Sequence, residues 1–491
     1  MNDSLVALIV ISGIVSLGAF IGFYAGKRHK MDLEQWTVGG RGFGLILVWL
    51  LMAGEVYTTF TFLGASGWAY SKGGPVLYIL GYQPLIYVVS FYILPQMWQV
   101  GQKHKLQTQA DFFRVRYGSK PLEALVSLMG VIFILPYLQL QLTGLGIIME
   151  VASFGRIPRT PAMIISFGIV AAFVFASGIR GVAWVSGLKD ILLLFAALFI
   201  GIAIPYHYFG GIGPMFTALI KANPRHLVMP GATQNLGHSW YITTVLLTAF
   251  GFFMWPQYVG GSFTAKSGDT LRRNAVIMPL YSITMPLMFF VGLSATLILP
   301  GLASGDLSLL TMVRKTFSPW FLGVIGGAGA LTAMVPAAVL ILTAATLFIK
   351  NFCRPVLAPS MTDSQVAKMA KITVLAITTV ALLFSILSST SLVSLLLLGY
   401  AGVAQFFPGV VFGLYWKRTS APAVFLGLST GVGIAAFLLL THRDPFLGWN
   451  AGFIGLCANF TITVLASLLF RKQPGEIVEL SPSSIPNPTF I

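Results

Sequence analysis

The sequence is dominated by apolar segments that are long enough to cross a lipid bilayer. We count thirteen of them, since about 20 apolar residues in a helix span the hydrocarbon core. Their approximate limits are 5–26, 43–70, 74–99, 121–149, 160–179, 187–209, 239–262, 274–299, 318–349, 370–389, 391–416, 420–441 and 448–470. Runs of this length do not alternate as the strands of a barrel do, so we expect an all-α membrane protein.

The composition excludes a soluble multi-domain protein. Of the 491 residues 56% are hydrophobic and 9% are charged, whereas soluble chains carry roughly 25% charged residues. The sequence contains no P-loop, no GxSxG motif and no metal-ligand spacing among its 6 histidines. We therefore expect neither an enzyme nor an organic cofactor, and we expect any transport to use an ion gradient.

The positive charges are distributed unevenly between the loops. With the N-terminus outside, the cytoplasmic loops carry 22 of the 30 Lys and Arg residues, Arg180 and Lys189 among them, and the outer loops carry 8. This bias predicts a multi-pass protein of the cytoplasmic (inner or plasma) membrane, with the N-terminus outside and the C-terminus in the cytoplasm. It also connects the net charge of +16 to membrane insertion and the lipid bilayer rather than to nucleic acid.

Glu55 is the one acidic residue that we place in the middle of a span, where a charge costs roughly 2.5–3.5 kcal/mol. Gly54 precedes it, and Tyr57, Thr58 and Thr59 follow it. This mixture of residues predicts a helix that is interrupted inside the membrane, where freed carbonyls bind cations or solute. Glu55 is then a residue for the coupling ion or the solute; the alternative is a protonated structural carboxyl.

A second interruption is predicted in the 239–262 span, at Trp255, Pro256 and Gln257. Proline removes an amide donor and kinks a helix, so an ordinary kink is the alternative interpretation. Interruptions in two corresponding spans favour a transporter with inverted repeats. The two repeats of five helices each would cover 43–209 and 239–416.

Other polar or small residues inside the spans have two interpretations. The stretch Thr332–Ala338 follows several glycines and indicates close helix packing or, alternatively, an ion pathway. The remaining polar candidates are Gln83, Tyr137, Gln139, Gln141, Thr143 and Gln405. Each of these is either an interhelical hydrogen-bonding residue or a ligand.

Several stretches, taken in order, resemble the sodium:solute symporter family over about residues 5–470. Its bacterial members include proline, pantothenate and monocarboxylate permeases. The matching stretches are Trp36–Arg41 (W-T-V-G-G-R), Ala110–Gly118 (A-D-F-F-R-V-R-Y-G), Gly178–Trp184 with Asp190 (similar to the family's G-G-x-x-A-V-x-W-T-D, with about three extra residues), Phe263–Ser267 with Arg272 and Arg273, and Phe407–Arg418. Each motif alone is weak, and the ordered set is strong.

The resemblance implies a LeuT-like fold, in which a five-plus-five inverted repeat has broken first and sixth core helices. On this basis we expect six regions. They are an extra helix and cytoplasmic loop (1–42), the first repeat (43–209), an external loop (210–238), the second repeat (239–416), two C-terminal helices (417–471) and a disordered cytoplasmic tail (472–491).

The resemblance also implies a sodium site, from which this chain departs. The backbone carbonyls of the site fall at Gly54, Tyr57 and Thr332. The family's Ser-Thr hydroxyl pair falls at Val335 and Pro336, and neither side chain offers an oxygen. We hypothesise that Glu55 either titrates, which would give proton coupling, or supplies a replacement ligand for Na+. The coupling ion is thus Na+ or H+.

The family's solute site falls at a set of polar and aromatic residues in five core helices. These positions are Tyr57, Thr58, Thr59, Gln83, Gln141, Trp255, Gln257 and Gln405. The stretch Ala53–Tyr70 looks most like the monocarboxylate branch, although we place no Lys or Arg at mid-membrane to pair with a carboxylate. Helix N-termini and hydroxyls would then bind it.

We therefore expect a secondary active symporter that imports a small organic acid, such as pyruvate or lactate, by alternating access. One alternative is a symporter for another solute class, namely an amino acid, pantothenate or a sugar. The other is a membrane sensor that binds its ligand without moving it.

Overall fold

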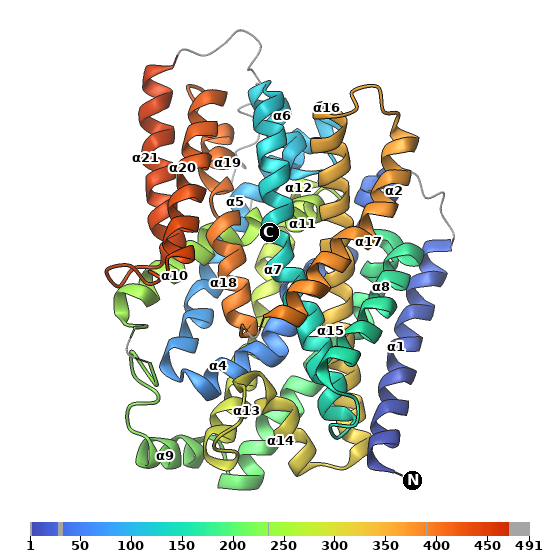
Figure 1. Cartoon of the computed structure of the whole chain (residues 1–491), viewed down its shortest axis with the longest axis vertical. Coiled ribbons are helices and arrows are strands. Elements are labelled where there is room, and N and C mark those ends of the chain that lie inside the picture. The colour runs from blue at the N-terminus through green and yellow to red at the C-terminus, as the bar shows by residue number, and fades with distance from the viewer. Residues whose placement is uncertain (1, 28–32, 234, 389, 471–491) are drawn as a thin grey trace.

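The computed structural model describes residues 2–27, 33–233, 235–388 and 390–470, and these residues form a bundle of helices (Figure 1). The region expected to be the first repeat (43–209) contains α3 (Leu45–Val56), η2 (Phe60–Gly64), α4 (Ala65–Ser71), η3 (Gly74–Leu77), α5 (Tyr78–His104), α6 (Gln109–Tyr117), α7 (Lys120–Ala152) and α8 (Arg159–Phe209). The region expected to be the second repeat (239–416) contains α10 (His238–Gly251), η4 (Phe252–Met254), α11 (Pro256–Ser262), α12 (Gly268–Ile277), η5 (Met278–Ile283), α13 (Thr284–Ile298), η6 (Gly305–Leu307), α14 (Ser308–Thr316), α15 (Pro319–Thr346), η7 (Leu347–Cys353), α16 (Arg354–Val356), α17 (Asp363–Leu387), α18 (Leu392–Val403) and α19 (Phe406–Tyr415).

The remaining helices flank the two repeats. They are α1 (Asp3–Lys27), α2 (Leu33–Val38), η1 (Gly39–Arg41), α9 (Ile212–Ala222), α20 (Ala421–Leu440) and α21 (Ala451–Leu469). Helix α1 packs against α8 and α15 at one side of the bundle, and α20 pairs with α21 at the opposite side (Figure 1). Short α9 and α14 lie at one end, and α6 and α16 lie at the other. The expected tail 472–491 lies outside the described residues.

The expectation of an all-α protein with many spanning helices is confirmed. Among the described residues, nine helices are long and apolar enough to cross a membrane, or up to twelve if each bent pair counts as one span. A shorter apolar helix, Arg159–Val174, lies within the fifth predicted segment. The number of spans is thus close to the thirteen that we counted from the sequence.

Helix α8 corrects the sequence interpretation at one point. Two helices meet within it at Gly178, whose φ is 55° and ψ is −177°, so the second helix, Gly178–Phe209, begins before residue 187, where we expected the sixth span to start. Glycine adopts this left-handed φ without the steric cost that a side chain brings. Lys189 and Asp190 therefore lie inside a spanning helix rather than in a loop or at its edge, and the cytoplasmic count of Lys and Arg falls from 22 to 21.

Both interrupted helices that we predicted are present. Helix α3 and the η2–α4 unit form one broken helix, with a bend of 51°. The α10–η4 unit and α11 form the second, with a bend of 49° at Trp255. A third bend of 42° separates α18 from α19, within a segment that we expected to be one continuous span.

Candidate functional site

The break in the first core helix leaves backbone carbonyls without partners within the helix. Tyr57 ends α3 with an extended backbone (φ −99°, ψ 91°), so the helical hydrogen-bond ladder stops there. The carbonyls of Ala53, Gly54 and Tyr57 accept hydrogen bonds from the Lys189 ammonium, with N–O distances of 3.3, 3.3 and 2.9 Å. The C-terminal end of a helix carries partial negative charge, which favours a cation at this position.

Lys189 is fully buried and is paired with its neighbour in sequence. Its Nζ lies 2.7 Å from Asp190 Oδ1, and the two side chains are 0% and 3% exposed. Tyr281 of η5 donates to the Asp190 carbonyl over 3.1 Å and to Oδ1 over 3.4 Å. The expectation that no Lys or Arg lies at mid-membrane is wrong, and so is the expectation that Glu55 is the only acid there.

Gly54 allows α3 and α8 to approach each other closely. A Cβ added at Gly54 would clash with Oγ of Ser186 and would lie 3.4 Å from Val335 Cγ1. Ser186 is one helical turn before Lys189, so this contact brings the lysine to the broken end of α3. The same contact places Val335 of α15 beside the break.

The Glu55 carboxyl is buried at 2% exposure, and in the described part of the chain neither oxygen has a hydrogen-bond partner. Its backbone carbonyl accepts from Tyr137 over 3.2 Å and from Tyr258 over 2.8 Å. These two tyrosines come from α7 and α11, so the second broken helix is bonded directly to the first.

The α15 side of the predicted sodium site offers few oxygens. The Thr332 hydroxyl donates to the Ala328 carbonyl of its own helix over 2.7 Å, and Val335 and Pro336 are buried apolar side chains. Thr332 lies on α15 about one helical turn before Val335, the residue that is beside the break. The oxygens that contact a cation here belong to α3 and to Asp190 instead.

The polar solute candidates are joined by hydrogen bonds around the first break. The Tyr57 hydroxyl lies 3.1 Å from that of Tyr87 and 2.9 Å from Oγ of Ser282, which in turn donates to Gln83 Oε1 over 3.0 Å. Thr59 donates to Gln141 Oε1 over 2.7 Å.

Thr58 belongs to the same break. Its hydroxyl accepts from the Phe60 amide over 3.3 Å.

Aromatic rings cover the second break. The Trp255 ring has its centroid 4.8 Å from that of Tyr137 and 5.4 Å from that of Tyr400. Phe252 continues this wall toward Tyr82, with centroids 6.0 Å apart.

Apart from Gln257, which is described below, three of the predicted solute residues keep a buried N–H donor without a partner. These donors are Nε2 of Gln83, Nε2 of Gln141 and Nε1 of Trp255, counted over the described residues. The oxygens of both glutamines already accept hydrogen bonds. An unpaired buried donor costs about 1–3 kcal/mol, so each of these three positions is suited to a group that brings an acceptor oxygen.

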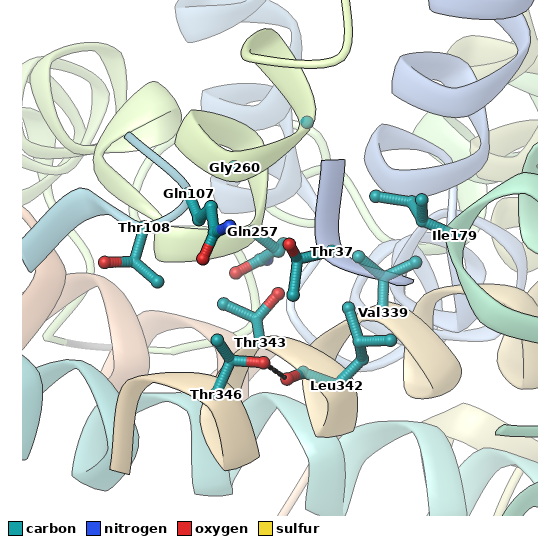
Figure 2. Close-up of a pocket in the computed structure, with 11 residues that line it drawn as sticks. Thr37, Gln107, Thr108, Ile179, Gln257, Gly260, Val339, Leu342, Thr343 and Thr346 are labelled. Atoms are coloured by element: carbon teal, nitrogen blue, oxygen red, sulfur yellow. Dashed lines mark hydrogen bonds between the residues drawn. The ribbon is translucent and has the colours of Figure 1, made fainter. Parts of the chain in front are cut away.

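Gln257 lies apart from this group. Together with Gly260, Gly261 and residues of α15, it lines a small cavity of about 10 Å³, large enough for about one water molecule (Figure 2). Thr37 of α2 and Gln107, which lies between α5 and α6, line the same cavity. Both atoms of the Gln257 side-chain amide lack a partner among the described residues.

Gln405 is not brought together with the other solute candidates. Its amide donates to the carbonyls of Ala401 and Gly452 over 3.1 and 3.0 Å, and Asn459 donates to its Oε1 over 3.2 Å. It therefore connects the bend between α18 and α19 to the C-terminal helix α21.

Sequence reasoning missed Lys189 and Asp190 as site residues. The family pattern quoted above ends in Thr-Asp, and this chain has Lys189 immediately before Asp190. A charged residue at a position where the pattern has a small neutral one was the available signal. Ser282, which joins Tyr57 to Gln83, had no comparable signal because its segment contains no recognised motif.

At the α4 end of the first broken helix, Asp306 of η6 packs against Gly67, whose added Cβ would lie 2.5 Å from Oδ1. Its Oδ2 accepts from the Leu392 amide over 3.0 Å at the start of α18. Burial raises the pKa of Asp306 from 3.8 to about 6, while this hydrogen bond and the charge of Arg159 act in the opposite direction.

Comparisons with known proteins agree with this architecture. Residues 36–431 match the model of the sodium:solute symporter family. The chain is 44% identical over 479 residues to the uncharacterized symporter YhjB of Bacillus subtilis (strain 168), which covers 95% of this chain and 97% of that protein. It is 30% identical over 489 residues to a monocarboxylate transport permease protein of Rhizobium johnstonii, covering 95% and 98% of the two chains.

Among solved structures, a Na+-coupled sialic acid symporter in a substrate-bound outward-open state matches with a TM-score of 0.78. The two sequences are 17% identical, and the match covers 95% of this chain and 98% of the other. The LeuT-like fold that we expected is thereby confirmed. The protein is a multi-pass membrane transporter rather than an enzyme, and it belongs to the sodium:solute symporter family.

Proposed function

We propose that this protein imports a small monocarboxylate, such as pyruvate or lactate, by cation-coupled symport. We further propose that it lies in the cytoplasmic membrane with its N-terminus outside and its C-terminus in the cytoplasm. The excess of Lys and Arg in the loops on one side, 21 against 8 after the correction for Lys189, supports this orientation.

The three unpartnered N–H donors of Gln83, Gln141 and Trp255 carry the proposal for the solute. A carboxylate accepts several hydrogen bonds and donates none, so it satisfies donors of this kind. Because all three donors are neutral, the ligand would bring one negative charge into a site that already contains Glu55. Pairing with amide and indole N–H groups is how a transporter can hold a small acid without a free cation.

The aromatic wall formed by Trp255, Tyr137 and Tyr400 supports a small organic body on the same solute. The relative from Rhizobium johnstonii, which is named as a monocarboxylate transport permease at 30% identity, supports the same class. The breaks in the two core helices provide the hinges that alternating access requires.

The coupling cation in this proposal is Na+ or H+. Glu55 supports both, since two buried carboxyl oxygens without partners can accept a proton or contribute to a cation site. Glu55→Gln keeps the size of the side chain and removes its charge, so it distinguishes a role in coupling from a role in packing.

Uptake of labelled pyruvate into proteoliposomes tests the proposal, with the Na+ gradient and the pH gradient imposed separately. We expect concentrative uptake that lactate inhibits and that proline, pantothenate and glucose do not. A binding signal without concentrative uptake would favour a sensor instead. If only proline, only pantothenate or only glucose inhibits uptake, the solute belongs to the class of that compound instead.

Gln141→Leu tests the donor argument, because it keeps a side chain of similar volume and removes the Nε2 donor, together with the Oε1 that accepts from Thr59. A lost hydrogen bond to a charged group costs about 1.5–3 kcal/mol, so we expect pyruvate affinity to fall at least tenfold. Lys221→Met, at an exposed position of α9, is the control and should leave uptake unchanged. Equal affinity in Gln141→Leu and the wild type would contradict the proposed site.

A further inference from the structure

The contacts of Lys189 coincide with the sodium ligands that the resemblance placed on the first broken helix. Those ligands are the carbonyls of Gly54 and Tyr57, and both accept hydrogen bonds from the Lys189 ammonium. The Ala53 carbonyl and Asp190 Oδ1 complete a set of four acceptors around one nitrogen. A charged group of the protein is thus placed where a mobile cation would be.

The α15 half of the expected sodium site lacks its two hydroxyl ligands. Val335 and Pro336 stand at the positions of the two hydroxyl ligands, and a Na+ ion prefers hard oxygen ligands. An ammonium group has three N–H donors and needs no oxygen from α15. The loss of both hydroxyls and the presence of Lys189 are therefore two changes with one consistent explanation.

The charges around Lys189 are also those that a cation site requires. Asp190 neutralises the ammonium over 2.7 Å, and the Lys189 charge also acts on the Glu55 carboxyl. A buried ammonium is tolerated only where partners satisfy it, because desolvation of an ion costs several kcal/mol. Adding a Na+ ion at the same carbonyls would place a second positive charge beside the first and would displace the hydrogen bonds of Lys189.

We propose that the Lys189 ammonium is a built-in substitute for the coupling sodium ion, which holds the broken end of α3 and excludes Na+ from this site. Solute uptake should then not depend on a sodium gradient. The statement on uptake rests on the proposed function, whereas the statement on Na+ binding does not.

Sodium-specific stabilisation of the purified full-length protein tests the binding statement without any solute. A bound ion raises the unfolding temperature by mass action. We expect the same melting temperature for the wild type in NaCl and in choline chloride at equal ionic strength. A rise specific to Na+ in the wild type would overturn the proposal.

Lys189→Thr removes the ammonium, frees the carbonyls and introduces one hydroxyl. In this variant we expect a saturable rise of about 2 °C in Na+ over choline. Should Lys189→Thr be too unstable to purify, the double variant Lys189→Thr/Val335→Ser, which restores one of the family's hydroxyls, is measured in its place. If neither variant gains a response to Na+, Lys189 does not exclude the ion and the proposal fails.

Pyruvate uptake provides the second measurement. We expect equal wild-type rates with Na+ and with choline outside, and in Lys189→Thr at least a fivefold loss in choline that Na+ reverses in part. Lys221→Met should behave as the wild type in every condition. Uptake by the wild type that stops without Na+ would overturn the inference, whereas a lack of pyruvate uptake in all conditions would count against the proposed solute and leave the melting experiment decisive.

Discussion

The two broken core helices occupy equivalent places in the two repeats, and their breaks are filled in different ways. At the first break, carbonyls of α3 surround the ammonium of Lys189, and Asp190 and Glu55 are close by. At the second break, Trp255 lies against the rings of Tyr137 and Tyr400.

The bends are nearly equal, at 51° and 49°, so the fold supplies two similar hinges and the side chains decide what each contains. Charged side chains surround the first break, whereas aromatic rings and the indole N–H of Trp255 line the second. The hydrogen bond from Tyr258 to the Glu55 carbonyl joins them. A movement of the backbone at one break can therefore alter the position of the other.

Removing the partner of the buried ammonium should produce the largest effect. Asp190→Asn leaves the Lys189 charge without its carboxylate, and breaking a buried ion pair costs about 3–5 kcal/mol. We expect a marked fall in the melting temperature. Asp269→Asn is the matched control, since its ion pair with Arg273 is exposed (side chains 70% and 60% exposed) and is worth at most about 1 kcal/mol. Equal effects of the two substitutions would show that the first break does not depend on its charge.

Asp306 should make the α4 half of the first broken helix sensitive to pH. Because its pKa is raised to about 6 in the folded protein, the folded state binds a proton more tightly than the unfolded state does. The free energy of unfolding should therefore fall as pH rises from about 4 to 6, by up to about 3 kcal/mol at 1.36 kcal/mol per pKa unit. Above about pH 6 this contribution to the free energy of unfolding is lost completely, and it no longer changes with pH.

The Asp306→Asn variant has no such carboxyl, so its melting temperature relative to the wild type should rise across that window. Melting curves of both proteins at a series of pH values measure this difference. A constant difference between the two proteins from pH 4 to 7 would contradict it.

At the second break, Trp255→Phe keeps an aromatic ring and removes the Nε1 donor. We expect pyruvate affinity to fall about tenfold, the loss of about 1.4 kcal/mol that one hydrogen bond supplies, with little change in melting temperature. Trp320→Phe serves as the control because Trp320 is 57% exposed. An equal loss of stability and affinity would mean that Trp255 acts through packing alone.

The smallest effect is expected at Thr332. Its hydroxyl is bonded to a carbonyl of its own helix, so Thr332→Val should change the melting temperature by less than the equivalent of about 0.5 kcal/mol. Its response to Na+ should equal that of the wild type. A large loss of uptake specific to this variant would mean that α15 contributes to ion coupling after all.

Much of the fold could be predicted from the sequence, because long apolar runs and interrupted helices leave direct traces. Glycine, threonine and proline at mid-span marked the first two breaks. The third bend, between α18 and α19, was not predicted, although Gly402 and Pro408 flank Ala404 and Gln405, where the helix turns. Its geometry depends on contacts with α21.

The candidate site could be predicted only in part. The glutamines and Trp255 were identifiable as polar groups in apolar surroundings. Lys189 was assigned to a loop, because hydropathy scales score every charged residue as exposed to solvent. Lys189 and Asp190 form an ion pair with each other, so they can be buried in a spanning helix despite their charges. That Lys189 binds the end of α3 follows from the packing of α8 against Gly54, which the sequence does not reveal.

The covalent attachment of the Lys189 ammonium sets a mechanical limit on the transport cycle. A dissolved ion can leave and return, so its two binding helices can separate completely. The lysine nitrogen is fixed to α8 by a four-carbon stem, and its hydrogen bonds hold the end of α3. The distance by which these two helices can move apart without breaking the contact is therefore bounded by the reach of one side chain.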